Sequence, residues 1–342
     1  MRTIAIETSC DDTSIAIVNN NDWSFQVEKI LAYSQIAEHQ KFWGVVPELA
    51  SRLHSEKIIA LLQTIGLKEI PNVDFISVTT QPGLPGSLVV WKTVWYELWA
   101  FYNKEVIAVH HILGHMFSIL LERKLEDIEF PLAILTASWG HNDIYIVEKQ
   151  NKKSGIPEEY PSFDFSDFSV TKVWWTLDDA AGECFDKVSR MLWGPYPWGV
   201  WISQKAEKWK ENELIHFKRI FLSHDKFEFS FSWMKSQVTF LLEKLKKENI
   251  QLDEQLICDI AYDFQEAIVE VMAKKLLHAW EIFWAKTLAL AWWVSANNRL
   301  CEYTQELINK KYKDISFYTP AKKLYSTDNW AMIGVVGLLS KI

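Results

Sequence analysis

The alternation of hydrophobic and polar positions predicts an α/β chain built from both strands and helices. Two β-branched runs, 3–8 and 13–18, flank the polar segment 9–12, which favours a tight turn, so they predict a β-hairpin. Apolar residues at helical spacing predict helices, and short uninterrupted apolar runs predict buried strands. Further strands are expected at 75–80, 130–137, 144–147, 288–291 and 315–318, and helices at 45–65, 176–191, 257–284 and from 327 onward.

Polar residues indicate where three of the helices begin. Ser87 is expected to cap the helix that follows the strand 75–80. Thr176 lies three residues before Asp179, as in a capping box. Either residue of the pair Thr327-Asp328 is expected to cap the last helix.

The order of these elements predicts two domains. Each half of the chain begins with strand, polar turn and strand, which is typical of two α/β domains that close on a nucleotide. The length of 342 residues also suggests two domains, at roughly 100–200 residues each. We expect an N-terminal domain over 1–129, to which the helix 327–342 could return, and a C-terminal domain over 130–326. A polar and aromatic stretch without a clear period predicts an inserted loop near 149–169.

The composition predicts a soluble protein of the cytoplasm. Hydrophobic residues make up 49% of the chain and charged residues 23%. No apolar run reaches the roughly 18–20 residues of a membrane span, and the first residues lead into a strand pattern without a signal peptide. Four scattered cysteines, with no Cys-x-x-Cys pair, indicate a reducing compartment. The net charge of −8 argues against unaided, non-specific nucleic-acid binding, although a local basic patch is compatible with it.

The segment 109–115 contains a histidine pair at helical spacing. The preceding apolar run predicts a strand that ends in a loop and then a helix, in which His111 and His115 lie one turn apart on one face. Two neutral imidazoles so placed can share one zinc or iron ion. Alternatively, one histidine is hydrogen-bonded in the core and the other is solvated. A third ligand is needed to decide between the two interpretations.

Two acidic features are also candidates for chemistry. Asp11 and Asp12 lie at the tip of the predicted hairpin, where they are either simply solvated or functional. The acidic residues near 178 could be first-turn residues that favour the helix dipole. Asp186 lies two turns further along, so the dipole does not account for it.

Several motifs, taken in order along the chain, resemble one protein family. They are Glu-Thr-Ser-Cys-Asp-Asp-Thr at 7–13, Val-Val-Pro-Glu-Leu-Ala-Ser-Arg at 45–52, His-His-Ile-Leu-Gly-His at 110–115, Asp-Asp-Ala-Ala-Gly-Glu-Cys-Phe-Asp-Lys at 178–187, Val-Ser-Ala-Asn at 294–297 and Thr-Asp-Asn at 327–329. Over nearly its whole length the chain resembles the universal tRNA N6-adenosine threonylcarbamoyltransferase family, formerly described as O-sialoglycoprotein endopeptidases.

This resemblance implies a fold and a set of site residues. The fold is the actin-like and Hsp70-like ATPase fold, with two ribonuclease-H-like domains around a cleft. His111, His115 and Asp328 would bind one divalent metal ion, iron or zinc. Asp11 would stand where such folds carry the first acid of the phosphate loop, which makes it a candidate catalytic residue. The residues implied to bind the substrate threonylcarbamoyl-AMP are Thr136, Ala137, Ser138, Trp139, Gly140, Asp186, Gly199 and Asn297.

The resemblance also implies a reaction and partners. The family transfers the threonylcarbamoyl group from threonylcarbamoyl-AMP to N6 of the adenosine 3′ of the anticodon, in tRNAs that read codons beginning with A. A metal with open positions would bind the donor phosphate as a Lewis acid. Besides tRNA, the partners of the family in bacteria are a dimerising paralogue and a small ATPase. No interaction with a membrane is expected.

Tryptophan and glycine have unusual frequencies. The chain contains 18 Trp and 12 Gly, and glycine usually makes up about 7% of residues, about twice its share here. One interpretation is an aromatic-rich core, which Trp91, Trp95 and Trp99 on one helical face would fit. However, the family has glycine where this chain has the following residues: Trp43, Trp91, Trp95, Trp139, Trp198, Trp233, Trp292, Trp293 and Trp330.

We hypothesise that the gene comes from an organism that decodes UGA as glycine and was translated here with UGA as tryptophan. Glycine is needed where backbone N–H groups approach phosphate or where φ is positive. An indole at Trp139 or Trp293 would fill the space of the ligand. If the tryptophans are genuine, a damaged nucleotide site and a non-catalytic scaffold role are expected.

Two other enzyme classes fit the sequence less well than the transferase. A metalloprotease of the His-Glu-x-x-His type needs a glutamate directly after the first histidine as general base, and Ile112 stands there. A small-molecule kinase of the same fold would lack the histidine pair and need a substrate-facing acid, for which the sequence offers no candidate. The transferase is therefore the favoured prediction.

Overall fold

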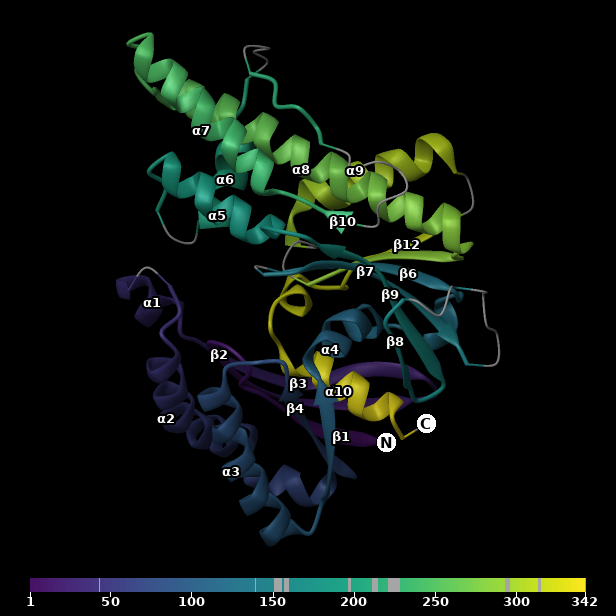
Figure 1. Cartoon of the computed structure of the whole chain (residues 1–342). Helices are drawn as coiled ribbons and strands as arrows, with labels where there is room; N and C mark the ends of the chain where they lie inside the picture. The colour runs from purple at the N-terminus through teal and green to yellow at the C-terminus, as the bar shows by residue number, and fades with distance from the viewer. Residues whose placement is uncertain are drawn as a thin grey trace. The chain divides into compact units, whose positions relative to one another are not determined.

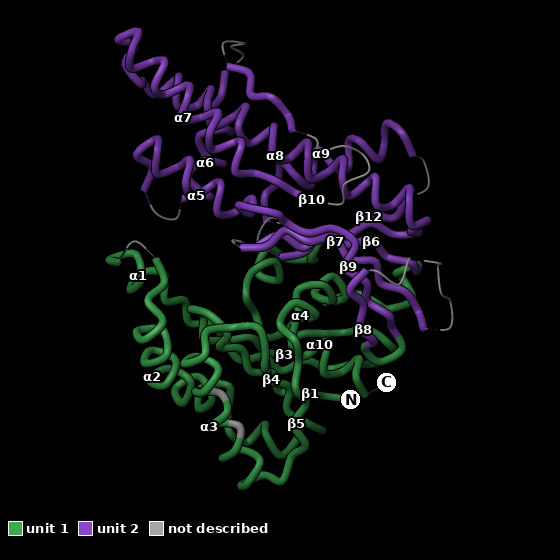
Figure 2. Tube along the Cα trace, in the orientation of Figure 1, with its two compact units in different colours: residues 1–129, 165–167, 319–342 green, residues 130–164, 168–318 purple. Residues whose placement is uncertain are grey.

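Contacts between residues divide the chain into two units, which Figure 2 distinguishes by colour. Unit 1 comprises residues 1–129, 165–167 and 319–342, and unit 2 comprises residues 130–164 and 168–318. The structure is a computed structural model, and it describes residues 1–42, 44–138, 140–150, 156, 160–195, 198–210, 215–220, 228–292, 296–312 and 315–341.

In unit 1 the first hydrophobic runs form one mixed sheet. Its strands are β1 (Arg2–Glu7), β2 (Asp12–Asn21), β3 (Ser24–Ser34), β4 (Phe75–Gln81) and β5 (Glu105–His110). They lie in the order β3-β2-β1-β4-β5, in which β1, β2 and β3 are antiparallel and β4 and β5 run parallel to β1. The predicted hairpin is confirmed, because Ile4 pairs with Ile17 across β1 and β2.

Helices cover both faces of this sheet. The helices of unit 1 are α1 (Ile36–His39), α2 (Pro47–Ile65), α3 (Pro85–Tyr102), α4 (His111–Phe117) and α10 (Trp330–Leu339). Successive side chains of a strand point to opposite faces. On β2, Val18 faces α10, and Thr13 faces α2, where its hydroxyl lies 2.7 Å from His54 Nδ1. A Cβ atom on Gly334 would lie 2.6 Å from Val18 Cγ2, so glycine permits the close packing of α10.

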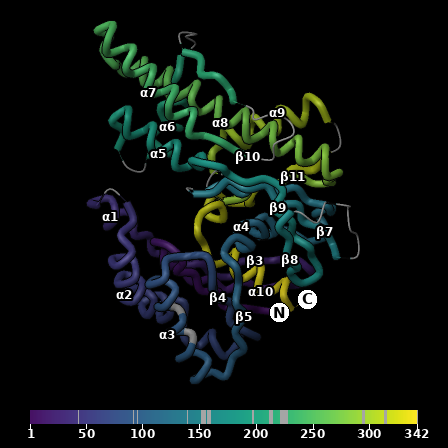
Figure 3. The backbone as a smooth tube through the Cα atoms, viewed as in Figure 1, coloured from purple at the N-terminus to yellow at the C-terminus, as the bar shows by residue number. Residues whose placement is uncertain are grey.

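The C-terminal helix α10 returns to the strand with which the chain begins. Figure 3 shows the yellow C-terminal segment beside the purple N-terminal strands of unit 1. Short 3₁₀ helices complete the unit: η1 (Gln40–Phe42), η2 (Leu67–Asn72), η3 (Ser118–Leu120), η4 (Leu125–Asp127) and η6 (Lys323–Ser326).

Unit 2 repeats the strand order of unit 1. Its strands are β6 (Leu132–Ala137), β7 (Asn142–Lys149), β8 (Ser162–Phe165), β9 (Phe168–Thr176), β10 (Glu228–Phe229), β11 (Thr287–Ala291) and β12 (Ser316–Tyr318). The path β10-β9-β7-β6-β11-β12 contains an antiparallel β6-β7-β9 meander followed by parallel β11 and β12, while β8 pairs with β9. When the short strands β8 and β10 are left out and the others are numbered in chain order, both sheets have the core order 3-2-1-4-5. This repeated topology confirms the predicted ribonuclease-H-like fold class.

The helices of unit 2 gather on one side of its sheet (Figure 1). They are α5 (Ala181–Met191), α6 (Trp198–Glu207), α7 (Ser232–Lys247), α8 (Glu254–Phe283) and α9 (Asn298–Lys311). Helix α8 is buried along most of its length, as its apolar stripe predicts. Across the described parts of both units, the helices are too short or too polar to span a membrane.

The predicted loop at 149–169 is wrong in its second half. Strand β8 and the first residues of β9 lie there. Residues 162–165, Ser-Phe-Asp-Phe, alternate polar and apolar positions, which is the period of a strand. Residues 151–155 and 157–159 lie outside the described part of the chain.

Two predicted helix caps are also wrong. Helix α3 begins at Pro85, which is suited to the first position of a helix, while the Ser87 hydroxyl donates to the carbonyl of Cys10 at 3.4 Å. Helix α5 begins only at Ala181, and the Thr176 hydroxyl donates to a backbone carbonyl of β7. In both cases a tertiary hydrogen bond takes the hydroxyl that a local pattern assigns to the helix.

Two tryptophans occupy the left-handed residue that ends a helix. Trp193 has φ 56° and Trp284 has φ 53°, and both side chains are more than three-quarters exposed, at 80% and 82%. The N–H groups of the next residues, Gly194 and Ala285, donate back to the carbonyls five residues before them, at 2.8 and 3.2 Å. This is the Schellman arrangement, whose left-handed position is usually glycine.

A third tryptophan lies in the turn between β2 and β3. Asp22 (φ 49°) and Trp23 (φ 62°) form its two central residues, since Asn21 pairs with Ser24. A two-residue turn with both φ angles positive is type I′, for which Asp-Gly is strongly preferred. Trp292, after β11, has φ 72°. These positions favour the hypothesis that UGA encodes glycine in this gene.

Other tryptophans fit an aromatic core. Trp330 and Trp198 are buried, at 0% and 6% exposure. Trp43, Trp139, Trp293 and the side chains of Trp91 and Trp95 lie outside the described part of the chain.

Candidate functional site

The two histidines of the predicted pair converge on one point in unit 1. Strand β5 leads directly into α4, whose first turn is capped by His110, since the His110 side chain accepts the N–H of Ile112 at 3.3 Å. The four-residue spacing then stacks His111 and His115 on one face of α4. Their Nε2 atoms lie 3.0 Å apart, and the exposed fractions are 4% and 0%.

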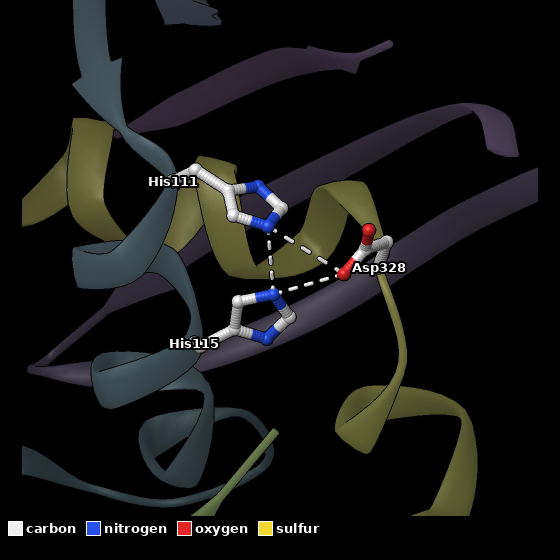
Figure 4. A group of neighbouring side chains, drawn as sticks. All are labelled: His111, His115 and Asp328. Carbon is white, nitrogen blue, oxygen red and sulfur yellow. Dashed lines mark hydrogen bonds and ion pairs between the residues drawn. The ribbon is translucent and has the colours of Figure 1, made fainter. Parts of the chain in front are cut away.

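Asp328 joins the pair from the start of α10 (Figure 4). The predicted cap by Thr327 or Asp328 is wrong, because Asn329 caps the helix and accepts the N–H of Met332 at 3.1 Å. The Asp328 carboxylate is therefore available for other partners. Its Oδ1 atom lies 2.9 Å from His115 Nε2 and 3.6 Å from His111 Nε2.

The donor set of this trio fits a divalent metal ion. One ligand atom of each of the three residues lies within 4.8 Å of the others. Ligands bound at about 2.1 Å and at right angles lie about 3 Å from one another, which agrees with the 2.9 and 3.0 Å separations. Two imidazoles and one carboxylate form the facial triad typical of iron(II), and zinc accepts the same donors.

The electrostatics of the pair favour one positive charge at this position. Burial lowers the pKa of His111, but the carboxylates of Glu7 and Asp328 outweigh this effect and raise the pKa of His111 to about 9. Burial and the charge of His111 lower the pKa of His115 to about 4. The carboxylates that favour a positive charge on His111 also stabilise a bound cation.

Asp11 lies in the turn between β1 and β2 but is not one of the three clustered ligands. Burial raises the pKa of Asp11, and the charge of Asp328 acts in the same direction. Burial, followed by the charge of Asp11, raises the pKa of its neighbour Asp12 to about 7. The hairpin tip thus presents carboxylates that hold protons more strongly than solvated ones do.

In unit 2 the predicted substrate residues 136–140 begin in the last two residues of β6. Thr136 and Ala137 end β6 and are buried. Ser138 follows β6, and its Oγ accepts hydrogen bonds from the N–H groups of Gly140 at 3.2 Å and His141 at 3.0 Å. Trp139 lies outside the described part of the chain.

The other predicted substrate residues come together around helix α6. A Cβ atom on Gly199 would lie 3.7 Å from Asp186 Oδ1 of α5. One turn further along α6, Ser203 Oγ lies 3.3 Å from Asn297 Nδ2. Asn297 also caps α9 and donates to Gln265 Oε1 of α8 at 3.0 Å. Asp186 and Asn297, far apart in sequence, therefore lie beside successive turns of α6.

The sequence interpretation missed three residues that support these sites. Glu7 contacts His111, while Ser203 and Gln265 hold Asn297. A polar Gln265 on the apolar stripe of α8 was a signal for a buried hydrogen bond. Glu7 stood in the first quoted motif, at the end of an apolar strand, but nothing local paired it with a histidine.

Together, the repeated 3-2-1-4-5 sheets and the two-histidine, one-aspartate cluster define an α/β protein of the actin-like ATPase class with a candidate metal centre. The sequence model described as TsaD, tRNA N6-adenosine threonylcarbamoyltransferase, matches residues 26–335. The chain therefore belongs to the tRNA N6-adenosine threonylcarbamoyltransferase family.

Proteins of this name from several bacteria are similar over nearly the full chain. The protein from Bdellovibrio bacteriovorus is 37% identical over 345 residues, covering 99% of this chain and 92% of its own length. The Staphylococcus epidermidis protein is 35% identical and covers 98% and 90%, and that of Mesoplasma florum is 34% identical and covers 97% and 96%. The prediction of a tRNA-modifying acyltransferase is confirmed, and the protease and scaffold alternatives are not favoured.

Solved structures agree on the fold. HypF from T. kodakarensis aligns with a TM-score of 0.56 at 12% identity, over 98% of this chain and 47% of that one. A full-length HypF in the phosphate- and nucleotide-bound form aligns with a TM-score of 0.55 at 9% identity, over 99% of this chain and 55% of that one. At these identities the likeness concerns the fold alone.

Proposed function

We propose that this chain transfers the threonylcarbamoyl group from threonylcarbamoyl-AMP to N6 of the adenosine 3′ of the anticodon, in tRNAs that read codons beginning with A, with the help of one divalent ion. The observation that carries the metal-assisted part is the convergence of His111 Nε2, His115 Nε2 and Asp328 Oδ1 from two segments that are far apart in sequence. Family membership supports the acyl transfer and its tRNA acceptor.

The reaction requires that the two substrates be positioned against each other and that the charge on the departing phosphate be stabilised. The exocyclic amine of adenosine attacks the carbonyl carbon of the mixed anhydride, a C–N bond forms, the C–O bond to phosphate breaks, AMP leaves and the amine loses a proton. When bound, a divalent ion supplies Lewis-acid stabilisation to the departing phosphate. His111, His115 and Asp328 would hold that ion. Because the acyl group is already activated, correct placement contributes most of the remaining rate.

Asp11 is our candidate for the proton acceptor. Burial raises the pKa of its carboxyl, and a carboxylate with a raised pKa is the stronger base. An Asp11→Asn variant is expected to keep its metal and to lose most of its transfer rate.

Residues of unit 2 are proposed to bind the nucleoside part of the donor. Asp186 and Gly199 lie side by side at α6, and a side chain at Gly199 would reach toward the Asp186 carboxylate. Asn297 is held in place by α6 and α8. The turn 136–140 is proposed to bind the threonylcarbamoyl-phosphate portion through its backbone.

Partners and location complete the proposal. A chain with a net charge of −8 benefits from a partner that contributes tRNA contacts, and we propose a dimerising paralogue and a small ATPase. Helix α3 exposes Val89, Tyr96 and Phe101, which supports a protein partner on unit 1. We propose that the protein works in the cytoplasm, where its tRNA acceptor is found.

A transfer assay tests the proposed function. Protein in which any UGA codon is translated as glycine is incubated with threonylcarbamoyl-AMP and tRNA, with and without a chelator. We expect modified adenosine only in the metal-loaded sample, and a loss of at least about 100-fold in His111→Ala and Asp328→Ala. Equal transfer by the two variants and the parent protein would exclude the metal-assisted mechanism.

A further inference from the structure

Glu7 is a buried carboxylate at the end of β1. Its exposed fraction is 1%. On β1 it shares the sheet face of Ala5, which is the face that α10 covers. A carboxylate removed from water is costly unless several hydrogen bonds satisfy it. Its partners therefore indicate why the fold retains a charge at this place.

Three donors from three segments hold Glu7. The hydroxyl of Thr79, on β4, donates to Oε2. The backbone N–H of Ser9, in the hairpin turn, donates to Oε1 at 2.5 Å. His111 Nδ1 lies 3.1 Å from Oε2. Since a carboxylate only accepts hydrogen bonds, His111 is the donor in this last contact.

This contact decides which nitrogen of His111 is available to a metal. With the proton of the neutral ring on Nδ1, the lone pair of Nε2 points to His115 Nε2 and Asp328 Oδ1, 3.0 and 3.6 Å away. A carboxylate behind a metal-binding imidazole fixes its tautomer and increases the basicity of the ligating nitrogen.

Ser9 is a second possible hydrogen-bond partner of His111 Nδ1. Its hydroxyl lies 3.2 Å from His111 Nδ1. Without Glu7, this hydroxyl can donate to Nδ1, which then places the ring proton on Nε2, where it blocks a metal. Glu7 therefore selects between two tautomers that the surrounding groups both permit.

We propose that Glu7 is the positioning residue of the metal centre: its carboxylate holds His111 in the tautomer and orientation that bind the ion. The inference rests on the metal site given under the proposed function. Glu7 does not touch the ion or the substrate, and it acts through His111.

Replacement of Glu7 by glutamine changes the charge and the hydrogen bonds of the side chain but keeps its volume. An amide has one oxygen and one NH₂ group. If its oxygen accepts from His111 and Thr79, its NH₂ group opposes the Ser9 N–H. If it turns around, the NH₂ group faces His111 Nδ1 and favours the tautomer with the proton on Nε2. Glu7→Gln is therefore as informative as Glu7→Ala and preserves the volume of the core.

The test measures binding of Co²⁺ alone to the full chain, by chelator competition and by visible absorption of the bound ion. We expect Glu7→Gln and Glu7→Ala to bind Co²⁺ about 10- to 100-fold more weakly than the parent, with an altered absorption spectrum. The matched control is Glu148→Gln, which changes a buried glutamate on β7 of unit 2. This control is expected to retain parental affinity and spectrum.

The outcomes separate this inference from the proposed function. If the parent protein binds no Co²⁺, the proposed metal centre is wrong. If the parent binds and a folded Glu7→Gln protein shows the same affinity and spectrum, the role of Glu7 is wrong. In the zinc-loaded parent, ¹H–¹⁵N spectra of the histidine rings should show a proton on His111 Nδ1, and a proton on Nε2 would also overturn the inference. If Glu7→Ala does not fold, Glu7→Gln and the ring spectra decide.

Discussion

Asn329 caps helix α10, and this leaves the neighbouring Asp328 carboxylate 2.9 Å from His115 Nε2. Asn329 thus stabilises the start of the helix, while the adjacent Asp328 is available to bind a ligand. The arrangement explains why the Thr-Asp-Asn segment at 327–329 needs two side chains with oxygen acceptors in succession.

Loss of the Asn329 cap is expected to destabilise unit 1. Asn329→Ala should lower the free energy of unfolding by about 1 kcal/mol, because a first-turn N–H of α10 loses its acceptor. Asn329→Ser should retain most of the stability, since serine caps equally well. Urea denaturation of the two variants measures this difference, and equal stability of Asn329→Ala and the parent would contradict the assigned cap.

Loss of the Gln265 side chain is expected to raise the KM for threonylcarbamoyl-AMP and to leave the metal content unchanged. Gln265→Ala removes the acceptor of the Asn297 side chain. A lost buried hydrogen bond of about 1–3 kcal/mol corresponds to an increase of about 5- to 150-fold in KM for threonylcarbamoyl-AMP. Steady-state transfer kinetics and metal analysis check this. Gln255→Ala, at a half-buried glutamine in the first turn of the same helix, is the matched control. A parental KM in Gln265→Ala would remove Asn297 from the proposed donor site.

Burial of His54 is expected to make stability fall in mild acid. Burial lowers the pKa of His54 from its ordinary 6.5, while Thr13 and the Cys10 carbonyl bond its two ring nitrogens. Below about pH 6.5 the unfolded chain binds a proton here and the folded chain does not. The free energy of unfolding therefore decreases as pH falls through this range.

The His54 contribution is isolated by comparison with His54→Gln. Urea denaturation at about pH 7.5 and about pH 5.5 should show a smaller loss of stability in the variant than in the parent, because the variant has no proton to take up at this position. Equal losses in the two proteins would show that other groups cause the acid sensitivity.

Replacement of the left-handed tryptophans by glycine is expected to stabilise the chain. A left-handed conformation costs an L-residue about 1–2 kcal/mol, and the indole of Trp284 is 82% exposed, so it gains little from packing. Trp284→Gly should therefore raise the free energy of unfolding by about 1 kcal/mol, less the entropy that glycine loses on folding. Trp174→Gly, at 1% exposure, should instead lower it by about 3–5 kcal/mol.

The codons provide a direct check of the same idea. We expect UGA codons at positions 23, 193 and 284. Mass spectrometry of the protein isolated from its source should then find glycine at these positions. UGG codons there would contradict the hypothesis.

Much of the fold follows from local patterns. Apolar runs predict β4, β6 and β11, and helical spacing predicts α2 and α8, because burial of one face dominates these elements. The strand β8 was missed, since four residues are too few for a pattern to stand out. The caps of α3 and α5 were missed because tertiary partners, which no local pattern contains, take the hydroxyls of Ser87 and Thr176.

The candidate site was less accessible to local reasoning. Spacing alone brought His111 and His115 together, whereas Asp328 was assigned only through the family motifs, because more than 200 residues separate it from the pair. Glu7 could not be found from spacing, since its place beside His111 arises from the parallel pairing of β1, β4 and β5. Sheet topology, and not sequence proximity, assembles this centre.

Metal content and threonylcarbamoyl transfer, measured together on Asp328→Ala, test whether the transfer depends on an ion held by His111, His115 and Asp328. About one divalent ion per chain is expected in the parent and in the exposed control Asp74→Ala, whereas Asp328→Ala is expected to lose both the ion and the transfer. A folded Asp328→Ala protein that retains the ion and transfers threonylcarbamoyl at the parental rate would contradict this expectation.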